Sequence, residues 1–80
     1  MTLEFNIQTH YQNAFGVFIV GEFLEKPPLF TSDQVFRLGE YAFEIWGMPK
    51  GEVWTFKMVS DKVFNFNMVL EEQLVCFEVL

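Results

Sequence analysis

Bulky apolar residues occupy every second position in two runs between Val53 and Leu70. The first run places them at Trp54, Phe56 and Met58, and the second at Phe64, Phe66, Met68 and Leu70. Successive side chains of a strand point to opposite faces, so a period of two predicts a sheet with one buried and one solvated face. These runs therefore favour β-strands.

The same criterion predicts further strands along the chain. We expect strands over residues 3–11, 17–24, 35–38, 41–45, 53–59, 63–70 and 74–80. Turn-forming residues separate them at 13–16, 27–28, 47–51, 60–62 and 71–73. Turns that recur about every 8–12 residues are typical of a small barrel or sandwich. A helix is conceivable only over residues 34–45, and Gly39 counts against it.

The strand over residues 17–24 differs from the others because it is apolar on both faces. Such a strand is more typical of the centre of a sheet than of its edge. Gly21 within it indicates a bulge or a sharp bend. We therefore predict an all-β fold: one domain over residues 1–80, forming a small antiparallel β-barrel of six or seven strands or a strongly bent sheet.

Aromatic residues make up 19% of the 80 residues, and 11 of them are Phe. Each buried aromatic ring removes about 150–250 Å² from water, so rings at the apolar positions of clean strands should form the core. We predict that Phe43, Ile45, Phe56, Phe64 and Phe66 are buried. A domain this small cannot easily enclose every ring, and the remainder are available to a partner.

Acidic residues outnumber basic ones by 11 to 5, which gives a net charge of −6. Binding to nucleic acid depends on clustered basic groups, and the five here are scattered. We therefore expect no nucleic-acid partner, and the same sign argument disfavours an anionic membrane surface. A basic protein partner is electrostatically acceptable.

The only cysteine, Cys76, lies in an apolar run and is expected to be a small buried residue. Glu4 interrupts the start of the chain and no apolar segment typical of a signal peptide follows it. We expect a cytoplasmic protein, and a phage or virion origin stays open.

Residues with catalytic or metal-binding chemistry are few. His10 is the only histidine, no nucleophile or carboxylate near it completes a known motif, and we expect it to be a surface residue at a strand end. One His and one Cys do not make a closed zinc site. Carboxylates such as Glu44 lie at the polar positions of strands, as a solvated face requires. We expect neither an enzyme nor a cofactor.

Two tryptophans, Trp46 and Trp54, flank the turn over residues 47–51. They form either a stacking platform for a partner or, as we favour, a cross-strand contact in the core. The C-terminal run adds Val75, Phe77 and Val79 on one face of its strand. A candidate interface therefore comprises Trp46, Trp54, Val75, Phe77 and Val79.

The stretch from Gly16 to Ile45 resembles the second-domain β-barrel of elongation factor Tu and related translation GTPases. The similarity rests on Gly16 and Gly21, which enclose a short apolar strand, and on Gly39-Glu40 followed by an alternating strand. The connection between Gly21 and Gly39 is longer than is usual for that family and contains two prolines. The resemblance implies a barrel fold, and it assigns no functional residue.

These features together predict a non-enzymatic protein-interaction module that binds another protein or a second copy of itself. A homodimer can form through an exposed apolar face or through an unpaired strand edge. The alternative is a barrel that binds a small ligand in an aromatic-lined cavity. A ligand cavity usually needs a polar residue among the inward-facing positions, and Glu22, Tyr41 and Glu78 are the candidates.

Overall fold

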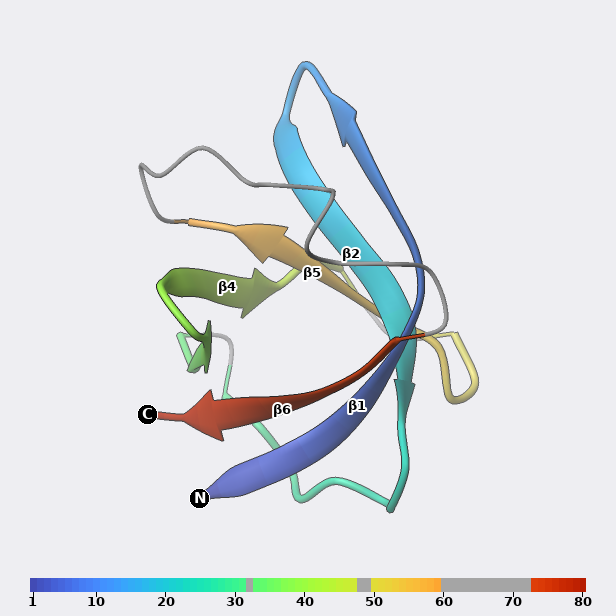
Figure 1. Ribbon diagram of the computed structural model, residues 1–80, viewed down its shortest axis with the longest axis vertical. Helices are drawn as coiled ribbons and strands as arrows, with labels where there is room; N and C mark the ends of the chain where they lie inside the picture. The colour runs from blue at the N-terminus through green and yellow to red at the C-terminus, as the bar shows by residue number, and fades with distance from the viewer. Residues whose placement is uncertain (32, 48–49, 60–72) are drawn as a thin grey trace.

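The computed structural model describes residues 1–31, 33–47, 50–59 and 73–80 (Figure 1). The described residues form six strands and no helix: β1 (Thr2–Asn13), β2 (Gly16–Phe23), β3 (Val35–Leu38), β4 (Tyr41–Ile45), β5 (Trp54–Met58) and β6 (Gln73–Val79). The prediction of an all-β fold is confirmed. Nowhere in these ranges is there a helix long and apolar enough to cross a membrane.

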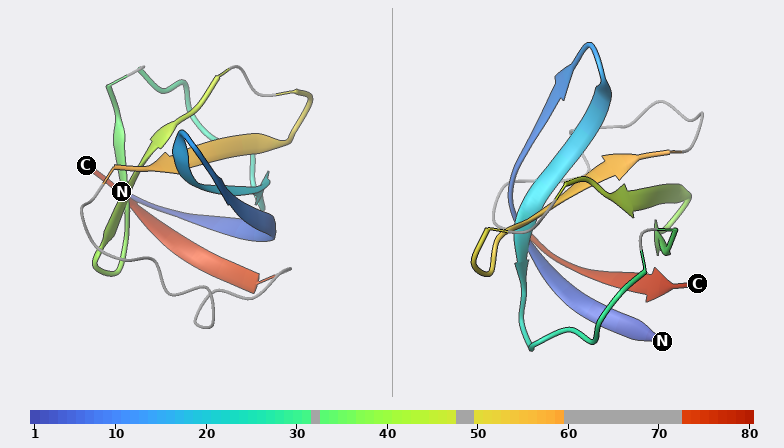
Figure 2. Two further views of the ribbon diagram at one scale, coloured as in Figure 1. Left: turned by 90° about the horizontal axis from the view of Figure 1, so that it is seen from above. Right: turned by 180° about the vertical axis from the view of Figure 1, so that it is seen from behind.

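The six strands close into a barrel in the order β1-β2-β5-β4-β3-β6, with every neighbouring pair antiparallel (Figures 1 and 2). β2 lies between β1 and β5, so its expected central position is confirmed. Closure gives each of the six described strands a neighbour on both sides. The described ring therefore leaves none of these six strands without a neighbour on one side.

The hairpins follow from the local turn chemistry. In the turn between β1 and β2, the Asn13 side-chain oxygen accepts a hydrogen bond from the Phe15 amide at 2.8 Å. Gly16 then adopts a φ of 136°, which residues with a side chain rarely adopt. Gly39, with a φ of 58°, turns the chain between β3 and β4 where a helix had been the alternative. The predicted turn over residues 13–16 is confirmed, and Gly39 separates the two strands predicted over residues 35–38 and 41–45.

The barrel interior is filled by large apolar side chains. The buried cluster consists of Phe5, Ile7, Val17, Ile19, Phe36, Phe43, Phe56 and Phe77. Phe56 is central, because its ring centroid lies 4.9 Å from that of Phe36, 5.0 Å from that of Phe77 and 5.2 Å from that of Phe5. The predicted burial of Phe43 and Phe56 is confirmed, and Ile45 is partly buried against the cluster.

One extra residue interrupts the pairing of β1 with β2. Ile7 pairs with Gly21 and Thr9 pairs with Val20, so Gln8 has no opposite residue. The predicted irregularity therefore lies in β1, opposite Gly21. A Cβ added at Gly21 would collide with the Asn6 carbonyl oxygen and lie 2.9 Å from the Phe5 ring. Glycine is required here because the two strands approach so closely.

Some expectations fall elsewhere. The predicted strand over residues 63–70, with Phe64 and Phe66, and the turn over residues 60–62 lie outside the described residues. The expected burial of Cys76 is wrong, because Cys76 is exposed. Phe77 points into the core, and a strand turns the adjacent residue to the opposite face. An apolar run in a strand of this barrel therefore does not bury every member.

Candidate functional site

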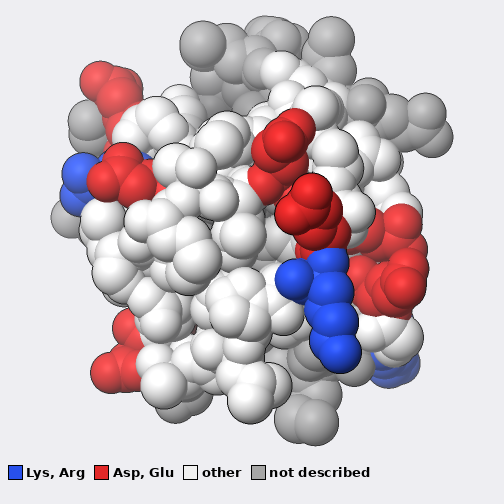
Figure 3. Space-filling model, turned by 90° about the horizontal axis from the view of Figure 1, so that it is seen from below, with Lys and Arg blue, Asp and Glu red and all other residues white. Residues whose placement is uncertain are grey.

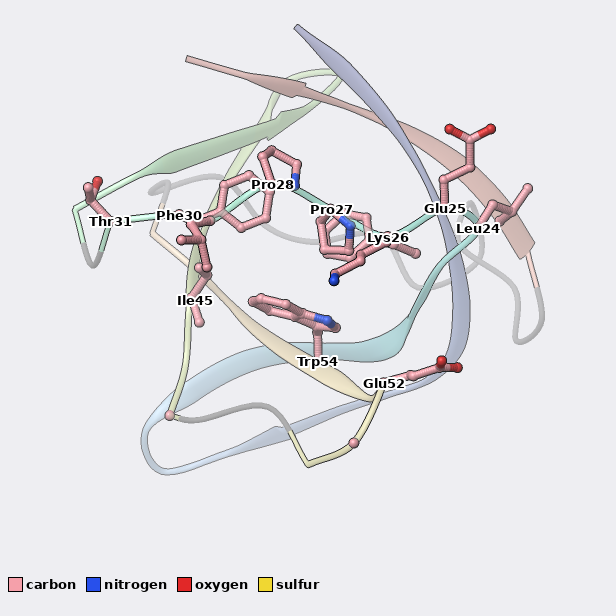
Figure 4. A pocket seen from close by; sticks show the side chains of 14 residues that line it. Leu24, Glu25, Lys26, Pro27, Pro28, Phe30, Thr31, Ile45, Glu52 and Trp54 are labelled. Carbon is pink, nitrogen blue, oxygen red and sulfur yellow. The ribbon is translucent and has the colours of Figure 1, made fainter.

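A cavity of about 1020 Å³ opens at one end of the barrel (Figure 4). Its walls come from the connection between β2 and β3 and, between β4 and β5, from Gly47, Gly51 and Glu52. Pockets for drug-sized ligands have volumes of about 300–1,000 Å³. The volume of this cavity lies at the upper end of that range, which is enough space for a small ligand or for several side chains of a protein partner. We call it the end cavity.

Three aromatic rings form the floor of the end cavity. Phe23 is the last residue of β2, Trp54 is the first residue of β5, and Phe30 comes from the connection between β2 and β3. The Trp54 ring lies edge-on to Phe23 at 5.4 Å and to Phe30 at 5.9 Å. Each ring is partly buried and packs against the core, so the floor is held in place from below.

Exposed apolar residues form part of the rim of the end cavity. Leu29 is fully exposed, and Leu24 retains 53% of its exposure. Pro27 and Pro28 lie between them and stiffen this part of the rim, because the ring of proline fixes its φ. Isolated exposed apolar residues are normal, but these residues adjoin an apolar cavity. The apolar surface therefore continues from the floor to the outside.

Three charged residues line the end cavity: Glu25, Lys26 and Glu52, all of them exposed. In Figure 4 the Lys26 side chain turns inward, whereas the carboxylates of Glu25 and Glu52 point outward. Figure 3 views the molecule from the side of the β2–β3 connection and shows a largely uncharged surface bordered by acidic side chains, with basic side chains among them. The cavity is thus lined mainly by apolar residues, and Lys26 is the one of these three charged residues that turns into it.

Polar contacts hold the far end of the β2–β3 connection. The Thr31 hydroxyl donates to the Asp33 carboxylate at 2.6 Å. This bond, together with a backbone hydrogen bond, lowers the pKa of Asp33 below its ordinary value of 3.8. The Gln34 side chain donates to the carbonyl oxygen of Leu80. The connection that bears Phe30 is therefore fastened both to itself and to the C-terminal residue.

A second aromatic surface lies on the outside of the barrel. Tyr11 stacks on Phe18 at 4.9 Å, and Trp46 meets Phe18 edge-on at 5.3 Å. Phe15 lies 6.4 Å from Trp46, and the Lys57 ammonium lies 4.9 Å from the Trp46 ring centroid. We call Tyr11, Phe15, Phe18 and Trp46 the outer aromatic cluster. It explains how β2 can be apolar on both faces.

The predicted interface residues do not form one surface. Trp46 is exposed on the outer aromatic cluster, whereas Trp54 faces the end cavity, so the expected contact between them in the core is wrong. The Trp46 backbone N–H donates a hydrogen bond to the carbonyl oxygen of Thr55, so Trp46 lies opposite Thr55. Because adjacent residues of a strand point to opposite faces, Trp54 lies on the other side of the barrel wall from Thr55 and Trp46. Val75 and Val79 pack against the core, and Phe77 is fully buried, so it offers no surface to a partner.

The candidate polar residues also occupy separate places. His10 lies within β1, opposite Ile19, and is partly buried instead of standing at the strand end. Glu22 and Tyr41 are partly buried, and Glu78 is exposed. In the described part of the chain no polar or charged residue is buried, and no three His, Cys, Asp or Glu residues gather as metal ligands would.

A smaller groove of about 450 Å³ runs beside β1 and β6, where Cys76, Leu3 and Leu74 line it. It shares Leu24 and Glu25 with the end cavity.

Sequence reasoning missed Phe23, Phe30 and Leu29 as parts of a site. The available signal was the pair Leu29-Phe30 directly after two prolines, because large apolar residues in a predicted loop need a contact. Comparisons with known proteins found no family model, no curated protein and no solved structure that matches the chain.

Proposed function

We propose that this protein is a non-enzymatic binding module that holds an apolar segment of a protein partner in its end cavity. The observation that carries this proposal is the continuous apolar surface from the floor, at Trp54 and Phe30, to the fully exposed Leu29. A small ligand inside the cavity would leave Leu29 exposed to water, whereas a polypeptide segment can cover both the aromatic floor and Leu29. Aromatic residues at the centre of a contact with water-excluding residues around it are typical of protein interfaces.

Fluorescence of Trp54 provides a direct test. The protein has two tryptophans, so a Trp46→Phe variant leaves Trp54 as the only one. We expect short apolar peptides from a random library to shift Trp54 emission and to bind in the micromolar range, about −8 kcal/mol. Phe30→Ala and Leu29→Ser should weaken that binding. Phe15→Ala, which changes an exposed ring outside the cavity, serves as the matched control.

Peptide binding that survives Phe30→Ala and Leu29→Ser would contradict the proposal. So would a library in which no peptide shifts Trp54 emission.

The volume of the end cavity favours one second candidate, a small apolar ligand. Native mass spectrometry of the purified protein separates the two functions. A co-purified compound of defined mass that is lost in Phe30→Ala would favour the ligand, and the same spectra report whether the protein forms a homodimer.

A further inference from the structure

The charge around the end cavity restricts the partner. Two of the three charged lining residues are acidic, and the whole chain carries a net charge of −6. Glu25 and Glu52 are exposed and directed away from the floor, so their carboxylates are positioned to meet groups that flank an inserted segment. A negative surface potential raises the rate at which cationic partners meet it.

The floor itself is compatible with basic side chains. Trp54 presents the aromatic residue type that attracts ammonium and guanidinium groups most strongly. Lysine and arginine also carry aliphatic stems that pack on apolar surface while their charged ends stay in water. The protein already makes one such contact, between Lys57 and Trp46 on its outer face.

From this combination we infer that the end cavity recognises a short segment of a protein partner in which apolar side chains are flanked by lysine or arginine. This inference rests on the proposed function. The apolar side chains contact the aromatic floor and Leu29, and the flanking cations face Glu25 and Glu52.

Lys26 acts against such a partner and therefore sets its specificity. Its side chain turns into the mouth of the cavity, where its ammonium repels a cation that enters too far. Since Lys26 and Glu52 are both exposed, each can be changed in charge with little effect on folding. The two changes have opposite expected effects on the affinity for a basic segment.

The test uses two synthetic peptides with the same Leu-Phe-Leu centre, one flanked on each side by two lysines and the other by two glutamates. Affinity is measured by Trp54 fluorescence in the Trp46→Phe background. At low salt we expect the lysine-flanked peptide to bind about tenfold more tightly or better. Lys26→Glu should strengthen its binding by about two- to fivefold, and Glu52→Lys should weaken it by a similar factor. Added salt should reduce all of these differences.

Glu78→Lys supplies the matched control. It changes the net charge by the same amount as Glu52→Lys, at an exposed residue that does not line the end cavity. Equal weakening by Glu78→Lys and Glu52→Lys would overturn the inference, because the effect would then come from net charge alone. Equal or tighter binding of the glutamate-flanked peptide would also overturn it and leave the proposed function standing. The proposed function itself is contradicted if neither of these peptides shifts Trp54 emission and no peptide of the random library shifts it either.

Discussion

Trp54 and Phe56 stack on the same face of β5, with 13° between their ring planes and 6.3 Å between their centroids. Trp54 belongs to the floor of the end cavity, and Phe56 is fully buried at the centre of the core. The candidate site and the core therefore form one continuous cluster of aromatic rings. The shape of the floor depends on how well the core is packed.

Replacing Phe56 should lower stability more than replacing any exposed ring. We expect Phe56→Ala to reduce the free energy of unfolding by about 3–5 kcal/mol, because it leaves a cavity among Phe5, Phe36 and Phe77. Urea unfolding measures the change, with Phe15→Ala, at a ring that is 68% exposed, as the control. Phe56→Leu serves if the alanine variant does not fold. Equal losses in the Phe56 and Phe15 variants would contradict the described core.

Gly21→Ala should destabilise the barrel through a steric clash. The new methyl group would meet the Asn6 carbonyl and the Phe5 ring, and overpacking of this kind costs about 1–3 kcal/mol or more. Gly39→Ala is the control for backbone strain. Gly39 has a φ of 58° but open space around its Cβ position, so an alanine there introduces strain without a steric clash. Thermal unfolding of both variants is the measurement. A Gly21→Ala protein as stable as the wild type would show that β1 and β2 do not approach so closely.

Removal of the Thr31 hydroxyl should raise the pKa of Asp33 toward 3.8, since that hydroxyl is the main cause of the lowered pKa. A lowered carboxyl pKa stabilises the folded state above the unfolded pKa, and this contribution disappears as pH falls through the folded pKa. Thr31→Ala should therefore reduce the loss of stability on acidification below about pH 3.8. Carbon-detected NMR titration of the Asp33 carboxyl measures the pKa, and Thr31→Ser should keep it low.

Cys76 should react with a thiol reagent in the folded protein. Its side chain is exposed, and it lines the groove beside β1 and β6. We expect one thiol per chain to react with Ellman's reagent without denaturant, as fully as in urea. A thiol that reacts only after unfolding would restore the original expectation of burial.

The alternation of apolar and polar residues was enough to predict strands at Tyr41–Ile45 and Trp54–Met58, because each position there has one clear preference for water or core. The strand order was not predictable, since it depends on contacts far apart in the chain, such as β6 between β1 and β3. The prediction that Trp46 and Trp54 contact each other was wrong for a related reason. The side of the barrel wall on which each ring lies is set by strand register, which local sequence does not display.

The end cavity was even harder to predict from the sequence than the strand order. Phe30 has no periodic pattern around it, and its place on the floor follows from how the β2–β3 connection crosses the end of the barrel. Only the assembled barrel brings it within 5.9 Å of Trp54.

Gln8 has no opposite residue on β2, so the number of residues in this part of β1 matters more than which amino acid occupies position 8. Before it, odd-numbered residues such as Phe5 and Ile7 point inward, and after it the odd-numbered Tyr11 points outward onto Phe18. Many side chains at position 8 should be interchangeable, whereas deletion of that one residue would exchange the two sides of the hairpin and send Tyr11 toward the interior. In a lineage of such proteins, this segment would accept substitutions freely and resist changes of length.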